Sequence, residues 1–133
     1  MLDNSSSHCK YPAMRYVCIL MGLMFCLFTY WQLNDLNQYE TERWYLWVVA
    51  YAICAVVSLA SYFKRLPLAV YAAIGAAALV AAIIRVQSIE WENTILYNKN
   101  NPSGNETGGL LIIVIWMGVL IATRKRLGCC CKK

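Results

Sequence analysis

The sequence predicts an all-α integral membrane protein, a bundle of four membrane-spanning helices. Of the 133 residues, 60% are hydrophobic and only 14% are charged, and the charges concentrate between long apolar stretches. A soluble domain of this size cannot bury so much apolar surface, and an unpaired charge inside a span costs at least about 2.5 kcal/mol. The lipid bilayer is therefore the first predicted partner. The net charge of +5 is attributed to basic flanks of the spans rather than to nucleic-acid binding.

Four apolar stretches have the length that a bilayer requires. They form a predicted membrane domain over residues 14–123, with spans at about 15–33, 44–63, 66–84 and 107–123. Residues 1–13 are predicted to be a disordered cytoplasmic tail, and residues 124–133 a basic, cysteine-rich cytoplasmic tail. The short connection around Pro67 makes the second and third spans an antiparallel hairpin. In the gap before the fourth span, Trp91 and Ile95 lie one helical turn apart, which predicts a short helix on the membrane surface.

The lysines and arginines predict the orientation. Lys10 and Arg15 flank the start of the first span, Lys64 and Arg65 join the second span to the third, and five basic residues follow the fourth. Most acidic residues fall instead in the gaps between the first two spans and the last two: Asp35, Glu40, Glu42, Glu90, Glu92 and Glu106. By the positive-inside bias, both termini are cytoplasmic and these two gaps lie outside.

Three short motifs carry a resemblance to a known family. They are Gln32-Leu33-Asn34-Asp35 after the first span, Trp47-Val48-Val49-Ala50-Tyr51 in the second, and Glu106-Thr107-Gly108-Gly109-Leu110 at the fourth. In this order they resemble the transmembrane protein 220 family, although Leu36 stands where that family has a proline, Asn37 where it has an acid, and Asn105 where it has an arginine. The resemblance implies a multi-pass membrane protein of a family whose activity is uncharacterised.

Asn34, Asp35, Arg85 and Glu106 form a candidate polar patch on the predicted outer side. Together they could bind a cation or a polar headgroup. A plainer interpretation is that Asn34 and Asp35 end a helix and start a turn, that Glu106 caps the fourth span, and that Arg85 anchors the third at the interface. The residues alone do not decide between the two.

A stripe of small residues follows the third span, with Ala69, Ala73, Ala77 and Ala81 repeating every four residues. Small side chains let helix backbones approach closely, which is how helices associate in lipid. The stripe therefore predicts a helix-packing surface, either toward another membrane protein or a second copy, or within the protein's own bundle.

The cysteines divide into two groups. Cys129, Cys130 and Cys131 follow a basic membrane exit, which is the setting of reversible palmitoylation. The alternatives are unmodified thiols and a zinc site, which the spacing of the cysteines favours less. Cys18, Cys26 and Cys54 lie inside spans and are interpreted as small packing residues. Asn105-Glu106-Thr107 is a weak glycosylation candidate at Asn105, because it adjoins a span.

The predicted spans lack the groups that catalysis or coupled transport needs. No Asp, Glu, Lys or His lies in the middle of a span, and the single histidine, His8, lies in the first tail. We therefore expect no enzyme, no cofactor and no metal site, but a structural or accessory subunit that acts through helix packing. The alternative is a component of a small transporter or channel, with the outer polar patch as its vestibule.

Overall fold

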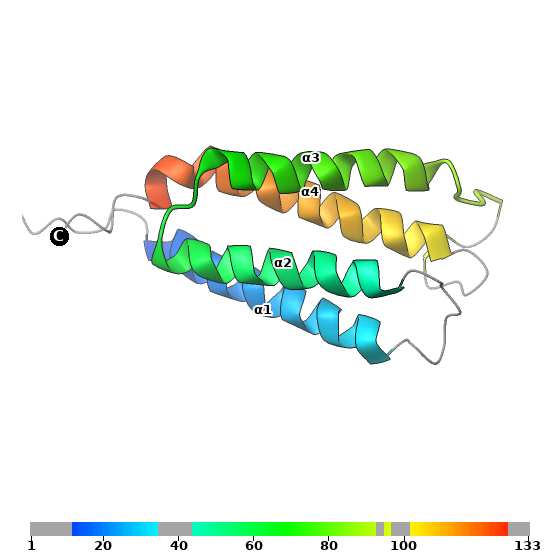
Figure 1. Ribbon diagram of the computed structural model, residues 1–133, viewed down its shortest axis with the longest axis horizontal. Coiled ribbons are helices and arrows are strands. Elements are labelled where there is room, and N and C mark those ends of the chain that lie inside the picture. The colour runs from blue at the N-terminus through cyan, green and yellow to red at the C-terminus, as the bar shows by residue number, and fades with distance from the viewer. Residues whose placement is uncertain (1–11, 35–43, 93–94, 97–101, 128–133) are drawn as a thin grey trace, which may run out of the picture. The chain divides into compact units, whose positions relative to one another are not determined.

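The computed structural model describes residues 12–34, 44–92, 95–96 and 102–127, and the regular secondary structure of these residues is helical, with no strand (Figure 1). The helices are α1 (Pro12–Asn34), α2 (Trp44–Phe63), α3 (Leu68–Val86) and α4 (Pro102–Leu127). All four are long and apolar enough to cross a membrane. The predicted all-helical class and its four spans are confirmed. Residues 1–11 and 128–133, most of the two predicted tails, lie outside the described residues.

Prolines set several helix boundaries. α1 begins at Pro12 and α4 at Pro102, both upstream of the predicted spans. Proline suits a first helical position because its fixed φ is already helical and its missing amide hydrogen would have no partner there. Pro67 instead directly precedes α3, with φ −56° and ψ 144°, and its carbonyl accepts a hydrogen bond of 3.1 Å from the Val70 amide. α2 has the bounds that the sequence predicts.

The chain divides into two compact parts, the first formed by residues 1–66 with 123–133 and the second by residues 67–122. In the first part, α1 and α2 run side by side and antiparallel (Figure 1). Gly22 makes their close approach feasible, since a Cβ there would lie 2.6 Å from Cδ2 of Leu59. Aromatic rings fill the space nearer the other end of the pair: Phe25 and Phe28 lie 6.3 and 5.5 Å from Tyr51 between ring centroids.

In the second part, α3 and α4 run antiparallel. Gly75 of α3 faces Met117 of α4, and a Cβ on Gly75 would lie 3.2 Å from the Met117 Cβ. The buried apolar residues of α4 recur at helical spacing: Leu110, Ile113, Met117 and Leu120. Each helix pair thus has a glycine at which an added Cβ would crowd the partner helix, and such small-residue contacts are typical of helix association in lipid.

The rest of the helix surfaces is apolar and exposed. Leu20, Val56 and Ile115 are each 66% exposed, on three different helices. Two buried hydroxyls of α2 are satisfied within the helix: Ser58 donates to the Cys54 carbonyl at 2.6 Å and Ser61 to the Val57 carbonyl at 2.7 Å. Apolar outward faces and internally satisfied polar groups are what a bilayer demands. The protein is an integral, multi-pass membrane protein whose helices contact lipid.

The prediction of a surface helix after α3 is wrong for the residues that the structure describes there. Residues 87–92 form turns and irregular backbone, and residues 95–96 are not helical either. The Ser88 and Ile89 amides still bond back to the Arg85 and Val86 carbonyls, at 3.0 and 3.4 Å. Ile89 is then buried while Trp91 is exposed, so the apolar residues do not form one continuous face. So short a segment cannot sustain a helix without such a face, because helix nucleation is unfavourable.

Candidate functional site

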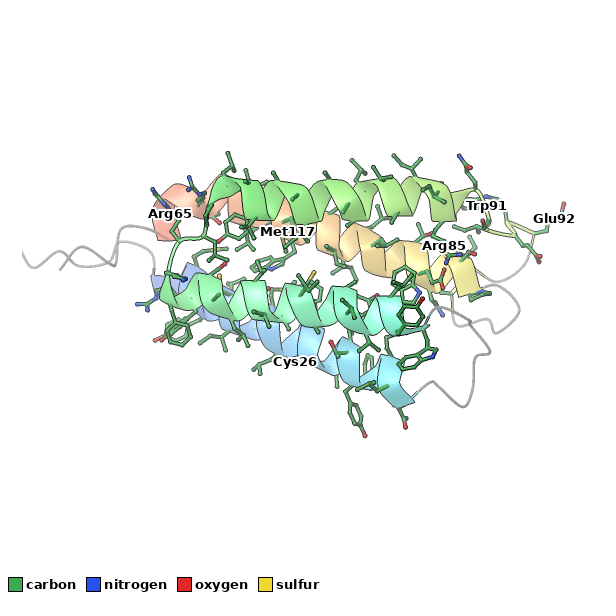
Figure 2. The ribbon with its side chains drawn as sticks, in the orientation of Figure 1. Cys26, Arg65, Arg85, Trp91, Glu92 and Met117 are labelled. Carbon is green, nitrogen blue, oxygen red and sulfur yellow. The ribbon has the colours of Figure 1, made fainter. Side chains whose placement is uncertain are left out.

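An ion pair of the second part joins the end of α3 to the beginning of α4. Nε of Arg85 lies 3.1 Å from Oε2 of Glu106. The Glu106 side chain is 11% exposed and that of Arg85 is 36% exposed. Figure 2 shows Arg85 at the C-terminal end of α3, with Trp91 and Glu92 in the segment that follows. The antiparallel course of the two helices brings these charges together across 21 positions of sequence.

The sequence suggested that Glu106 caps α4, but the structure places it elsewhere in the helix. The helix begins at Pro102, so Glu106 is its fifth residue, and the first turn contains no acidic residue. The stretch around Pro102 and Gly104 had the composition of a linker, which concealed its helical course. Because α4 begins four residues before Glu106, the Glu106 side chain pairs with Arg85 and does not cap the free amides at the start of the helix.

Two hydroxyl residues that the sequence analysis did not single out lie beside this pair. Ser103 and Thr107 are each 7% exposed, and Oγ1 of Thr107 is buried without a hydrogen-bond partner among the described residues. With Leu110 they follow the spacing i, i+4, i+7, so the buried face of α4 begins polar and continues apolar. That spacing is the signal that could have found them, had the helix start been placed at Pro102.

Gly104 lies in the same turn and brings a preceding segment close. A Cβ at this position would collide with the carbonyl oxygen of Ile95 and lie 2.8 Å from its carbonyl carbon. Ile95 therefore packs directly on the first turn of α4. We call Arg85, Ser103, Gly104, Glu106 and Thr107 the polar end of α3 and α4.

In the polar end, the charges of Arg85 and Glu106 neutralise each other. A guanidinium already faces the carboxylate, so a second cation at Glu106 would be repelled by Arg85. With Arg85 one-third exposed, the ion pair contributes on the order of 1 kcal/mol rather than the several expected of a fully buried pair. The arrangement can hold two helix ends together, and the buried Thr107 hydroxyl adds one group able to donate or accept a hydrogen bond.

The structure unites two of the four residues of the predicted outer patch. Arg85 and Glu106 are in contact, whereas Asn34 is the exposed last residue of α1, in the other compact part. Asp35 lies outside the described residues. The patch as a whole stays a prediction.

The alanine stripe of α3 is exposed. Ala69, Ala73 and Ala77 are all exposed and Ala81 is half-buried. The buried residues of α3 are Tyr71, Ala78 and Ala82, nearly opposite the stripe around the helix. Packing within the chain uses that other face, together with Gly75.

The remaining predicted sites divide between described and undescribed residues. Cys18 and Cys54 are buried and agree with a packing role, whereas Cys26 is exposed on α1. Cys129, Cys130 and Cys131 lie outside the described residues. Asn105 lies within α4, and the Thr107 hydroxyl of its motif is buried, which is unlike the exposed loop typical of a glycosylated asparagine. Among the described residues, no three His, Cys, Asp or Glu side chains gather as a metal site would require.

Comparison with known proteins identifies the family. The family described as "Transmembrane family 220, helix" matches residues 24–122, which include all of α2 and α3, most of α4 and the C-terminal part of α1. No curated protein and no solved structure matches the chain. The matched region contains the polar end of α3 and α4, the alanine stripe and the three motifs noted in the sequence. The chain therefore belongs to transmembrane family 220.

Proposed function

We propose that this protein is a non-catalytic accessory subunit that binds another membrane protein through α3. The observation that supports this is the exposure of Ala69, Ala73 and Ala77 on the side of α3 opposite its buried residues. An alanine face gains little from lipid, because its side chains are too short to make many contacts with acyl chains. Against a second helix it permits backbone approach and close van der Waals packing.

The expected occupant of the stripe is a transmembrane helix of a different protein, packed on α3 with its own small residues. Both helix pairs of this chain already use a glycine contact of this kind internally, at Gly22 and at Gly75. The alanine stripe is a third surface of small residues, and it is exposed rather than packed against another of the described helices. The proposed orientation places both termini in the cytoplasm. The stripe would lie at mid-membrane depth in this orientation and in the reverse one.

Enlarging the stripe should release the partner. We expect Ala73→Leu with Ala77→Leu to reduce the amount of a stoichiometric foreign membrane protein copurified from native membranes by at least about tenfold, since two leucines separate the backbones. The measurement is native mass spectrometry of the particle in mild detergent, with proteomics of the same fraction. Ala72→Leu with Ala76→Leu is the matched control, because both residues are exposed on α3 and lie about 100° around the helix.

The control variant should keep the partner. A particle that contains only copies of this chain, or a lone 15.1 kDa chain, would contradict the accessory-subunit proposal. Equal loss in both double variants would mean that the stripe has no special role.

The transporter or channel component is the second candidate, with an outer vestibule as its site. The polar end of α3 and α4 is the observation that favours it, because it places a charged pair and a buried hydroxyl beside one another. It is the weaker candidate, because Arg85 and Glu106 already compensate each other's charge.

We also propose that the cysteines of the last tail are palmitoylated. The sequence supports this through three adjacent cysteines beside Arg124, Lys125 and Arg126 at the membrane exit. Replacing Cys129, Cys130 and Cys131 with serine should abolish incorporation of a clickable palmitate analogue in cells. Cys26→Ser is the control, since Cys26 is an exposed thiol inside α1. Labelling that persists in the triple variant, or that Cys26→Ser removes, would contradict the assignment.

A further inference from the structure

Two arginines from distant parts of the chain bind backbone carbonyls at the end of α2 and in the connection that follows it. Nε of Arg15, near the start of α1, donates to the Tyr62 carbonyl at 3.2 Å, and its guanidinium lies 4.5 Å from the centre of the Tyr62 ring. Nε of Arg124, near the end of α4, donates to the Leu66 carbonyl at 3.0 Å. Between these two carbonyls the chain carries Lys64 and Arg65, both exposed. We call these four cations, Arg15, Lys64, Arg65 and Arg124, the basic rim.

Capping of α2 explains part of the arrangement. The last carbonyls of a helix have no partner within it, and cations are favoured at this negative end of the helix dipole. Arg15 serves this purpose at Tyr62, whereas Arg124 binds the Leu66 carbonyl in the connection after α2, and each arginine uses only Nε. A guanidinium has five N–H donors in a planar fork, and the remaining donors of both arginines have no hydrogen-bond partner among the described residues.

Capping does not explain the charge of the basic rim. No carboxylate pairs with any of its four cations in the part of the chain that the structure describes. Of the described acidic residues, Glu106 pairs with Arg85 instead. The rim is therefore a concentration of positive charge without a paired carboxylate among the described residues.

The rim also lies at the depth of lipid headgroups. Lys64 and Arg65 directly follow a helix of spanning length, and the aromatic pair Tyr62 and Phe63 precedes them, with ring centroids 4.9 Å apart. Aromatic residues mark the membrane–water interface, and the phosphates of lipids lie just outside it. Arginine in particular matches a phosphate with two parallel N–H donors.

From this convergence we infer that the basic rim binds the phosphate of an anionic phospholipid headgroup. Arg15 and Arg124, held in place by the Tyr62 and Leu66 carbonyls, direct their remaining donors to the phosphate. Lys64 and Arg65 supply the further charge that favours an anionic lipid over a zwitterionic one. This inference is independent of the alanine stripe and of the accessory-subunit proposal.

The test compares two lipids on the full-length protein in mild detergent. Phosphatidylglycerol and phosphatidylcholine are titrated separately, and bound lipid is counted by native mass spectrometry. We expect wild-type protein to prefer phosphatidylglycerol. Lys64→Gln with Arg65→Gln should weaken phosphatidylglycerol binding about 30-fold and leave phosphatidylcholine binding unchanged. Both residues are exposed, so the variant should fold normally, which a thermal melt verifies.

Two controls separate a site from general attraction. Arg43→Gln with Lys99→Gln changes the net charge equally but in the predicted outer gaps, and it should retain the lipid. Lys64→Arg with Arg65→Lys keeps both charges and should also retain it. Equal affinity of wild-type protein for the two lipids, or equal loss in the Arg43 and Lys99 variant, would overturn the inference. Complete displacement of the lipid by millimolar inorganic phosphate would assign the site to a free anion and overturn the lipid assignment.

Discussion

Gly104→Ala is expected to lower the melting temperature of the protein by about 5 °C. Alanine is the better helix former by about 1 kcal/mol, so intrinsic propensity alone would raise the stability of α4. The added Cβ, however, collides with the backbone carbonyl of Ile95, which cannot rotate away as a side chain can. Overpacking of this kind costs about 1–3 kcal/mol, and relief requires the segment before α4 to move.

Gly108→Ala is the matched control for this change. Gly108 lies one turn further along α4, and a Cβ there meets nothing within 4 Å. We expect its melting temperature to equal or exceed that of the wild-type protein, as followed by tryptophan fluorescence in detergent. If both variants melt alike, Ile95 does not pack on α4 as the structure has it.

Removing the charge of Arg85 and removing the charge of Glu106 should lower the stability of the protein by different amounts. We expect Arg85→Gln to lower the free energy of unfolding by about 2 kcal/mol and Glu106→Gln by only about 1 kcal/mol. The reason is burial: the Glu106 side chain is 11% exposed, so its charge, deprived of Arg85, would remain in a less polar environment than that of Arg85, which is 36% exposed. The measurement is reversible unfolding in mixed detergent micelles.

The double variant completes the cycle. Without either charge, no carboxylate deprived of Arg85 remains, so Arg85→Gln with Glu106→Gln should be about as stable as Glu106→Gln alone. Glu92→Gln, at an exposed position after α3, should stay within about 0.5 kcal/mol of wild type. An Arg85→Gln protein no less stable than Glu106→Gln would contradict the burial argument.

The sequence by itself determined the fold class and the spans. A bilayer solvates neither charge nor unpaired backbone, so hydropathy alone separates spans from gaps. That constraint is local, which is why α2 has its predicted bounds. It is weaker at helix ends, where proline and glycine have several uses. For this reason the start of α4, the place of Glu106 and the expected surface helix after α3 were misjudged.

Only the tertiary structure decided which small residues pack and which charges meet. Composition marks Gly22, Gly75 and the alanine stripe alike as small, but helix rotation turns the glycines toward the paired helix and leaves Ala73 and Ala77 exposed. Likewise, the pairing of Arg85 with Glu106 and the contacts of Arg15 with Tyr62 and of Arg124 with Leu66 depend on which helix ends lie adjacent. Hydropathy places each helix across the membrane but does not specify its rotation or its neighbour, because lipid is equally compatible with every apolar face.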